Sequence, residues 1–339
     1  MNSSLPFTYR KNMTVTSEKY LRHVKYQLDR LREKQGSEEM ILRLECISSN
    51  TPQSSPDFEI GLFAADDGQA IYYNKWKSQN PEHIFICING LESHGGWFSS
   101  IAGEFVEKNI VVYAVDRRGS GLNSRNYGSW QDWLCDIYKM TKIARKENPS
   151  CKVHLLSICF GAKVATACVT DKPDDYDSLI YMSPGIKVKV EPSLKEKLQI
   201  GVAALPCFSV NIPSPIKNDD MFTDSVDAKY FLFQDKLRTH SPRASDFYQG
   251  FMLDRYIRKS PEKVRTPSLV LMAANDKIVN NSEVAKYIDR FSRRHVIIEY
   301  PSEHIIFFGQ SKDNLISDII DFINNMPKKE CPSVNIKAY

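Results

Sequence analysis

The chain has 339 residues, of which 42% are hydrophobic and 25% are charged, and its formal net charge is +4. These values are ordinary for a folded soluble protein with one large or two modest domains. The small net charge and short basic clusters argue against nucleic-acid binding, and no run approaches the roughly 18 apolar residues of a membrane span.

Residues 1–57 are predicted to form an N-terminal extension. They lack the basic region and apolar core of a secretory signal, which favours a cytoplasmic protein. Between residues 17 and 36 apolar side chains recur at helical spacing, and residues 50–57 are rich in Ser, Pro and Asn, as a linker is. The expected helix can pack against the main fold, or it can dock a partner or form a homodimer.

From residue 58 onward, short apolar runs alternate with helical patterns. The expected strands are residues 71–75, 84–88, 110–115, 153–158, 179–182, 269–273 and 296–299. This rhythm predicts an α/β fold with a mostly parallel sheet and helices on both faces.

One interval is too long for a single crossover helix. The residues between 184 and 266 carry their own apolar and aromatic side chains. A mainly helical cap is therefore expected at 186–265, inserted between a first core part, 58–185, and a second core part, 266–339.

The cysteines indicate a reducing compartment. None of the eight belongs to a Cys-x-x-Cys pair, which favours reduced thiols over a disulfide framework or a zinc site. Cys87, Cys135, Cys151 and Cys168 are predicted to be buried core residues.

Phosphate-binding glycine motifs and clusters of metal ligands are missing from the sequence, so no metal and no cofactor are expected.

The most informative segment is Ser157-Ile158-Cys159-Phe160-Gly161. It follows an apolar run and precedes a helical one, and small residues stand two positions before and after the cysteine. A sharp turn from strand to helix requires small residues there, because larger side chains would clash. Centring the motif on Ser157 would put a leucine at a small position. The sequence therefore predicts Cys159 as a nucleophile.

A nucleophilic thiol needs a base and a group that orients the base. Asp276 follows the expected strand 269–273, and His304 follows the strand 296–299. Carboxyl ends of parallel strands meet at one edge of a sheet, and nucleophile, acid and histidine occur in this order in such folds. Either residue alone would be typical of a turn, but together they predict a catalytic triad of Cys159, His304 and Asp276.

Two backbone N–H groups are expected to stabilise an oxyanion. One belongs to Phe160, directly after the nucleophile, and the other to Leu91, in the glycine-rich loop 89–96 that follows strand 84–88. His94 lies in the same loop. It is expected either to contact the substrate or to stabilise the loop through a hydrogen bond.

These motifs together resemble the α/β-hydrolases, and within them the monoacylglycerol lipase and lysophospholipase-like group of the serine aminopeptidase S33 type. The resemblance covers about residues 58–326, including an inserted cap. It is carried by residues 89–98, 115–121 and 157–161 and by the segments around Asp276 and His304.

Three positions depart from the pattern of that group. Its first loop usually begins His-Gly, but here Asn89 stands before the glycine; a histidine usually occupies the place of Ser120; and the nucleophile is usually serine rather than Cys159. The first two departures are expected to affect packing and loop hydrogen bonds. The resemblance also implies that Asp116 has a structural role.

A thiol in this position implies a thioester intermediate. If water accepts the acyl group, the enzyme is a hydrolase; if an amine, alcohol or thiol accepts it, the enzyme is an acyltransferase. Dienelactone hydrolases and polyhydroxyalkanoate synthases are similar folds that represent the two cases with a cysteine. A ligand-binding protein on the same fold is a further alternative, although the intact order of the three residues argues against it. A last alternative is that Cys159 was introduced in place of a native serine.

The expected substrate is a small-molecule ester or thioester with an apolar acyl chain, either free or attached to a carrier. Leu205 and Phe208, in the expected cap, would line an acyl pocket or form the core of the cap itself.

Overall fold

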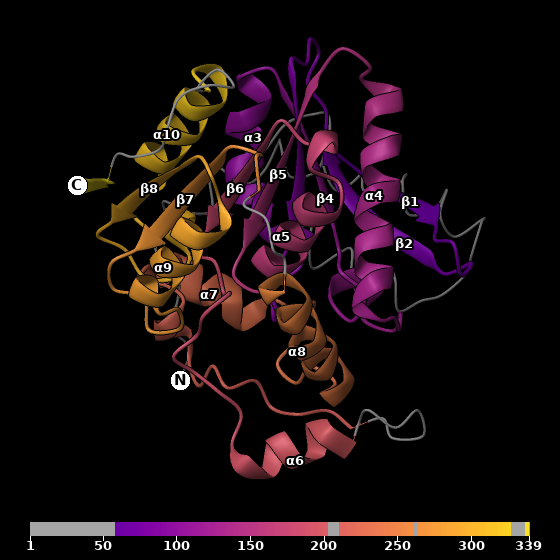
Figure 1. The fold of residues 1–339 in the computed structure, drawn as a ribbon, viewed down its shortest axis with the longest axis vertical. Coiled ribbons are helices and arrows are strands. Elements are labelled where there is room, and N and C mark those ends of the chain that lie inside the picture. The colour runs from indigo at the N-terminus through magenta and orange to yellow at the C-terminus, as the bar shows by residue number, and fades with distance from the viewer. Residues whose placement is uncertain (1–57, 203–209, 260–263, 327–335, 339) are drawn as a thin grey trace, which may run out of the picture.

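The computed structural model describes residues 58–202, 210–259, 264–326 and 336–338 (Figure 1). The helix expected between residues 17 and 36 lies outside the described residues, as do Leu205 and Phe208.

The described strands form one sheet with the order β1-β2-β4-β3-β5-β6-β7-β8-β9. Their bounds are β1 Phe58–Ala64, β2 Ala70–Trp76, β3 His83–Ile88, β4 Ile110–Val115, β5 Lys152–Ile158, β6 Ser178–Met182, β7 Ser268–Ala273, β8 His295–Tyr300 and β9 Ile336–Ala338. Strand β2 runs antiparallel to β1 and β4, and the remaining neighbours are parallel. The mostly parallel sheet and all the strands expected from the sequence are confirmed.

Helices cover both faces of this sheet (Figure 1). Helix α3 contacts α10, and α4 contacts α5. The bounds are α3 Ser99–Glu107, α4 Trp130–Glu147, α5 Gly161–Asp171, α6 Leu194–Val202, α7 Val226–Gln234, α8 Ala244–Arg258, α9 Asn281–Phe291 and α10 Lys312–Asn324. None of these helices combines the length and apolarity that crossing a membrane would require.

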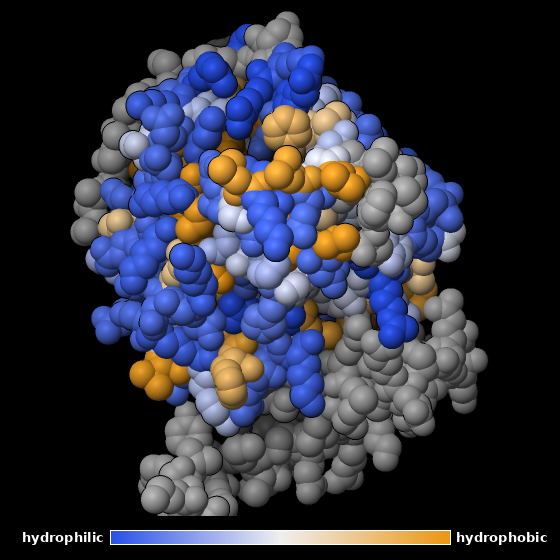
Figure 2. Space-filling view, turned by 90° about the horizontal axis from the view of Figure 1, so that it is seen from below, coloured by the Kyte–Doolittle hydropathy of each residue, from blue (hydrophilic) through white to orange (hydrophobic). Residues whose placement is uncertain are grey.

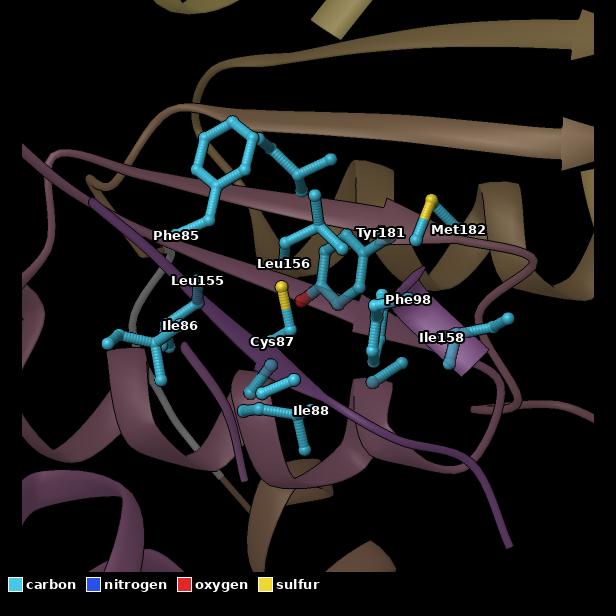
Figure 3. Packing of buried hydrophobic residues seen from close by; sticks show 14 of the residues in the cluster. Phe85, Ile86, Cys87, Ile88, Phe98, Leu155, Leu156, Ile158, Tyr181 and Met182 are labelled. Atoms are coloured by element: carbon cyan, nitrogen blue, oxygen red, sulfur yellow. The ribbon is translucent and has the colours of Figure 1, made fainter. Parts of the chain in front are cut away.

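The core is centred on the inner strands, whose side chains are buried on both faces. All six side chains of β3 are buried, and Figure 3 shows Cys87 among Leu156, Tyr181 and other apolar neighbours. Burial on both faces explains the unbroken apolar runs that identified these strands.

The prediction for the four cysteines is partly wrong. Cys87 and Cys168 are buried, Cys151 is partly exposed, and Cys135 is exposed. Cys135 lies on α4 between buried Leu134 and buried Asp136, so a helix that buries its neighbours turns this side chain outward.

The long interval between β6 and β7 contains the helices α6, α7 and α8, as expected of a helical insertion, and its described residues include no strand of the sheet. Helix α8 packs on α5 and on α6, and α6 lies farthest from the sheet (Figure 1). The insertion therefore packs against α5, the helix that begins directly after the predicted nucleophile turn. A separate cap domain with bounds at 186–265 stays a prediction.

Candidate active site

Cys159 occupies the tight turn between β5 and α5. Its φ angle is 51°, a left-handed conformation that a residue with a side chain adopts only under constraint. The constraint comes from the backbone: the Cys159 N–H donates to the Met182 carbonyl at 3.1 Å, and its carbonyl accepts from the Gly185 N–H at 2.8 Å. The turn is thus fixed to the end of β6.

The small residues predicted around the turn have identifiable contacts. A Cβ atom on Gly161 would lie 2.4 Å from the carbonyl oxygen of Ile88. The hydroxyl of buried Ser157 donates to the Ile180 carbonyl at 3.3 Å. Gly185 is a further position at the turn that has room for no side chain, because a Cβ there would lie 2.9 Å from the carbonyl carbon of Cys159. The sequence did not predict this requirement. That contact joins two different strand ends, so a local motif does not reveal it.

His304 and Asp276 meet at the carboxyl ends of β8 and β7. His304 Nδ1 lies 2.8 Å from Asp276 Oδ2, and neither side chain has exposed surface. Asp276 Oδ1 accepts the N–H groups of Ile278 at 2.7 Å and Val279 at 2.8 Å. Burial alone would raise the pKa of Asp276, but His304 and these N–H groups lower it below its ordinary value. The carboxylate is therefore charged and fixes the imidazole with its proton on Nδ1.

The second nitrogen of His304 remains available to the thiol. Among the described residues, the Cys159 thiol is the one group that interacts with the imidazole from this side. Burial alone would lower the pKa of His304, but first Asp276 and then Cys159 raise it above its ordinary value. The structure thus brings the three residues of the predicted triad together, and their roles as thiol, base and orienting acid stay a prediction.

The two expected oxyanion donors lie beside the thiol. Leu91, Cys159 and Phe160 line the same cavity. Within the described residues, neither the Leu91 N–H nor the Phe160 N–H donates a hydrogen bond. A Cβ on Gly90 would lie 3.2 Å from Cys159 Cβ, so the loop passes close to Cys159. Both N–H groups are therefore available to a ligand in the cavity.

Asn89 and Ser120, two residues that differ from the usual monoacylglycerol lipase pattern, contact each other. Asn89 Nδ2 donates to Ser120 Oγ at 3.0 Å and to the Ser93 carbonyl at 2.6 Å, and Asn89 Oδ1 accepts the Arg117 N–H at 3.0 Å. Both Asn89 and Ser120 are fully buried. The pair therefore joins the oxyanion loop to the loop that follows β4.

Asp116 joins the same two loops through the backbone. Its Oδ1 accepts the Gly95 N–H at 2.6 Å, and its Oδ2 accepts the Leu122 N–H at 2.7 Å. Both carboxylate oxygens are thus used in holding loops, which agrees with a structural role.

Of the two roles considered for His94, the geometry favours loop stabilisation. His94 Nδ1 accepts the Gly96 N–H at 3.0 Å, and Nε2 lies 3.1 Å from Asp235 Oδ2. The Trp97 indole donates to the same oxygen at 2.7 Å. His94 is buried and is not among the residues that line the cavity. It therefore ties the loop to the insertion.

The cavity beside Cys159 has a volume of about 630 Å³, within the usual range of small-molecule sites. Apolar side chains form most of its wall: Leu91, Val188, Val190, Ile200, Ile216, Phe247, Phe251 and Ile278. Lys163, Asp254 and Arg258 also line it, although the sequence analysis did not single them out. The available signal was the place of Lys163, one helical turn after Cys159.

A parallel sheet with a strained nucleophile turn and an acid and histidine at later strand ends defines an α/β-hydrolase. The family model for serine aminopeptidase, S33, matches residues 79–305, and the chain belongs to this family. It is accordingly a hydrolase of the esterase or lipase type, with a cysteine at the position of the nucleophile.

Individual relatives are distant. The monoglyceride lipase homolog of Monkeypox virus is 23% identical over 220 residues, which are 62% of this chain and 78% of that protein. The monoacylglycerol lipase of Mycolicibacterium smegmatis is 21% identical over 267 residues, 76% of this chain and 93% of the relative. The solved monoacylglycerol lipase of Paleococcus ferrophilus aligns with a TM-score of 0.66 at 18% identity, over 75% of this chain and 98% of that one. At this identity the structural likeness shows the fold alone.

Proposed function

We propose that this protein hydrolyses an acyl ester or thioester through a Cys159 acyl-enzyme. One observation carries the proposal: His304 is held by Asp276 on Nδ1, and among the described residues its other side interacts with the thiol of a strained turn alone. A structural histidine buried this deeply would have both nitrogens satisfied.

The first half of the reaction forms a thioester. His304 Nε2 takes the proton from Cys159 Sγ, and the thiolate attacks the acyl carbonyl carbon. The negative charge that develops on the carbonyl oxygen is stabilised by the N–H groups of Leu91 and Phe160. When the bond to the leaving alcohol or thiol breaks, His304 returns the proton to it. Asp276 stabilises the imidazolium between these two transfers.

The second half releases the acid. His304 removes a proton from water, the resulting hydroxide attacks the thioester carbonyl, and the bond to Sγ breaks. The proton returns to the thiolate through His304, so the enzyme ends in its starting state. The products are one carboxylic acid and the alcohol or thiol released earlier.

The acyl group is proposed to be apolar. The cavity wall near Cys159 carries Leu91, Ile216 and Ile278, and burying an apolar chain there gains roughly 25 cal/mol per Å² of surface removed from water. The relatives named monoglyceride or monoacylglycerol lipase support an ester as the donor.

Transfer to an amine, alcohol or thiol is the competing outcome, because the same intermediate serves both reactions. Thioesters react readily with such acceptors, and the cysteine favours this alternative more than a serine would. A non-catalytic binding role is the second alternative.

Intact-protein mass spectrometry after incubation with octanoyl esters and octanoyl thioesters tests the proposal. Wild-type protein is expected to gain one acyl mass, Cys159→Ala to gain none, and Cys135→Ala to behave like wild type. Cys135 is the matched control because it is an exposed thiol on α4.

The fate of the adduct separates the alternatives. Clearance by water alone supports hydrolysis, whereas an adduct that persists until an amine, alcohol or thiol is added supports acyl transfer. If no donor gives an adduct that depends on Cys159, the catalytic proposal fails and ligand binding becomes the better explanation.

A further inference from the structure

The wall of the cavity carries charge at a place where the proposed apolar acyl chain needs none. Lys163 and Asp254 face each other from α5 and α8, with Lys163 Nζ 2.8 Å from Asp254 Oδ2. Their side chains are 11% and 17% exposed. Removing such a pair from water often costs more than the attraction returns, so apolar residues of similar size would serve stability at least as well.

Lys163 is also placed close to the chemistry. It comes one helical turn after Cys159, and its ammonium lies 5.3 Å from the ring centroid of Phe160, whose N–H is a proposed oxyanion donor. Lys163 and Cys159 line the same cavity.

Arg258 adds a second cation one turn beyond Asp254 on α8. It lines the same cavity and is exposed, and it makes no hydrogen bond or ion pair with the described residues. The other charged residues of the wall, Lys197 and Glu191, pair with each other at 2.6 Å. Among the described lining residues, the positive charge of Arg258 is thus left without a counter-charge.

Charge balance indicates what would complete this wall. Lys163 and Arg258 carry two positive charges, and Asp254 carries one negative charge. A single anionic group in the cavity brings the sum to zero. Figure 2 looks onto the molecule from the side on which α6 lies and shows a band of apolar side chains on a mostly hydrophilic face.

We propose that the acyl donor carries an anionic group, a carboxylate or a phosphate, which Lys163 and Arg258 bind while its acyl carbonyl lies at Cys159. This inference rests on the proposed acyl-enzyme chemistry and specifies its substrate class. The anion can come from the far end of the acyl chain or from the leaving group, and both sources present the same chemistry to the two cations.

Three donors of equal acyl length distinguish the sources. The neutral reference is the hexanoyl thioester of N-acetylcysteamine. The adipoyl half-thioester of N-acetylcysteamine carries a carboxylate on the acyl side, and hexanoyl phosphopantetheine carries a phosphate on the leaving group. Wild-type kcat/KM is expected to be about tenfold or more above the reference for one of the two anionic donors, since hydrogen bonds to charged groups are stronger than those between neutral groups.

Variants assign that preference to the two cations. Arg258→Met is the primary variant because Arg258 is exposed and has no described partner whose loss would disturb folding. It is expected to lower the ratio of kcat/KM for the anionic donor over the neutral donor about tenfold. Lys163→Met is expected to lower the same ratio. The matched control is Arg255→Met, an exposed arginine of α8 that does not line the cavity, and it should keep the wild-type ratio.

The outcomes separate this inference from the proposed function. Equal kcat/KM for all three donors, or an Arg258→Met variant that keeps the wild-type ratio, overturns the anion proposal. In that case a neutral donor that still forms the Cys159 adduct leaves the proposed function intact. Failure of every donor, anionic or neutral, to acylate Cys159 overturns both.

Discussion

Gly161 decides whether the turn at Cys159 can form. A methyl group at this position would lie 2.4 Å from the Ile88 carbonyl oxygen and 2.6 Å from that of Asn89. Both oxygens belong to the backbone where β3 enters the oxyanion loop, and backbone there yields less readily than a side chain. The nucleophile turn and the oxyanion loop are therefore kept in contact by the absence of a side chain.

Gly161→Ala is expected to lower the free energy of unfolding by about 1–3 kcal/mol, because the added methyl overpacks this contact. Turnover should fall more than stability alone explains, since the loop carrying Leu91 must move. Urea unfolding and kcat/KM measure the two effects. Gly103→Ala is the control, because Gly103 lies in helix α3 and a Cβ there would have no atom within 4 Å. This change should raise the free energy of unfolding by about 0.5–1 kcal/mol.

Asn89 and Ser120 form a buried hydrogen-bonded pair, and a double-mutant cycle can measure the energy of their interaction. Asn89→Ala leaves the Arg117 N–H and the Ser93 carbonyl without their partner, so a loss of about 1–3 kcal/mol in unfolding free energy is expected. Ser120→Ala should cost less. Because the two side chains bond each other, the double variant should cost less than the sum of the single variants. Additive losses would show that the bond contributes nothing.

Helix α6 stands apart from the other helices at the scale of elements. It has no buried side chain, whereas α5 buries nearly all of its residues. Leu194, Leu198 and Val202 are 82%, 74% and 48% exposed and share one helical face. Nine residues are also too few for an isolated helix to be stable in water.

Hydrogen exchange should therefore distinguish these two helices. The amides of α6 are expected to exchange with low protection through local opening, while those of α5 exchange only when the sheet unfolds. Mass-spectrometric exchange of peptides covering 194–202 and 161–171 checks this. Equal protection of both peptides would contradict it.

The elements show what the sequence could and could not predict. Strands β2 to β8 were predicted, most of them because a buried parallel strand appears as an unbroken apolar run. Strand β1 was missed because its side chains alternate between buried and exposed and it pairs with β2 alone in a hairpin. The hairpin turn carries Asp67 and Gly68, with a φ of 82° at Gly68, and this dipeptide was the overlooked signal.

The candidate site shows a similar limit. Cys159, Asp276 and His304 could be predicted because each follows its own strand in a fixed order. The Lys163 and Asp254 pair joins α5 to the insertion across a long stretch of sequence. The packing of α8 on α5 brings the two side chains together, and a local sequence pattern does not predict that packing.

For the whole molecule, two buried histidines determine part of the pH dependence of folding. His83 Nδ1 lies 3.0 Å from His154 Nε2, and His154 Nδ1 lies 2.7 Å from Ser178 Oγ. Burial, with the neighbouring His83 and Lys152, lowers the pKa of His154 to about 3. The unfolded chain, with a pKa of about 6.5, therefore binds a proton that the folded chain excludes.

Stability should consequently fall as pH falls from about 6.5 toward 3, by up to about 1.4 kcal/mol per pH unit for this one proton. His154→Gln is expected to flatten the slope of unfolding free energy between about pH 6.5 and 5. Urea unfolding at several pH values measures it. The control is His240→Gln, which removes an exposed histidine outside this cluster. An unchanged slope in His154→Gln would assign the acid sensitivity to other groups.

The position of the insertion also governs the order in which the protein is built. Strand β6 lies in the interior of the sheet, yet its neighbour β7 is encoded only after the whole insertion. A chain emerging from the ribosome therefore holds Cys159 in its turn while β6 is still an open edge, which can pair with other chains. Asp276 and His304 arrive with the strands that close this edge. The interval in which the nascent protein exposes this edge is therefore also the interval in which Cys159 lacks Asp276 and His304 as neighbours.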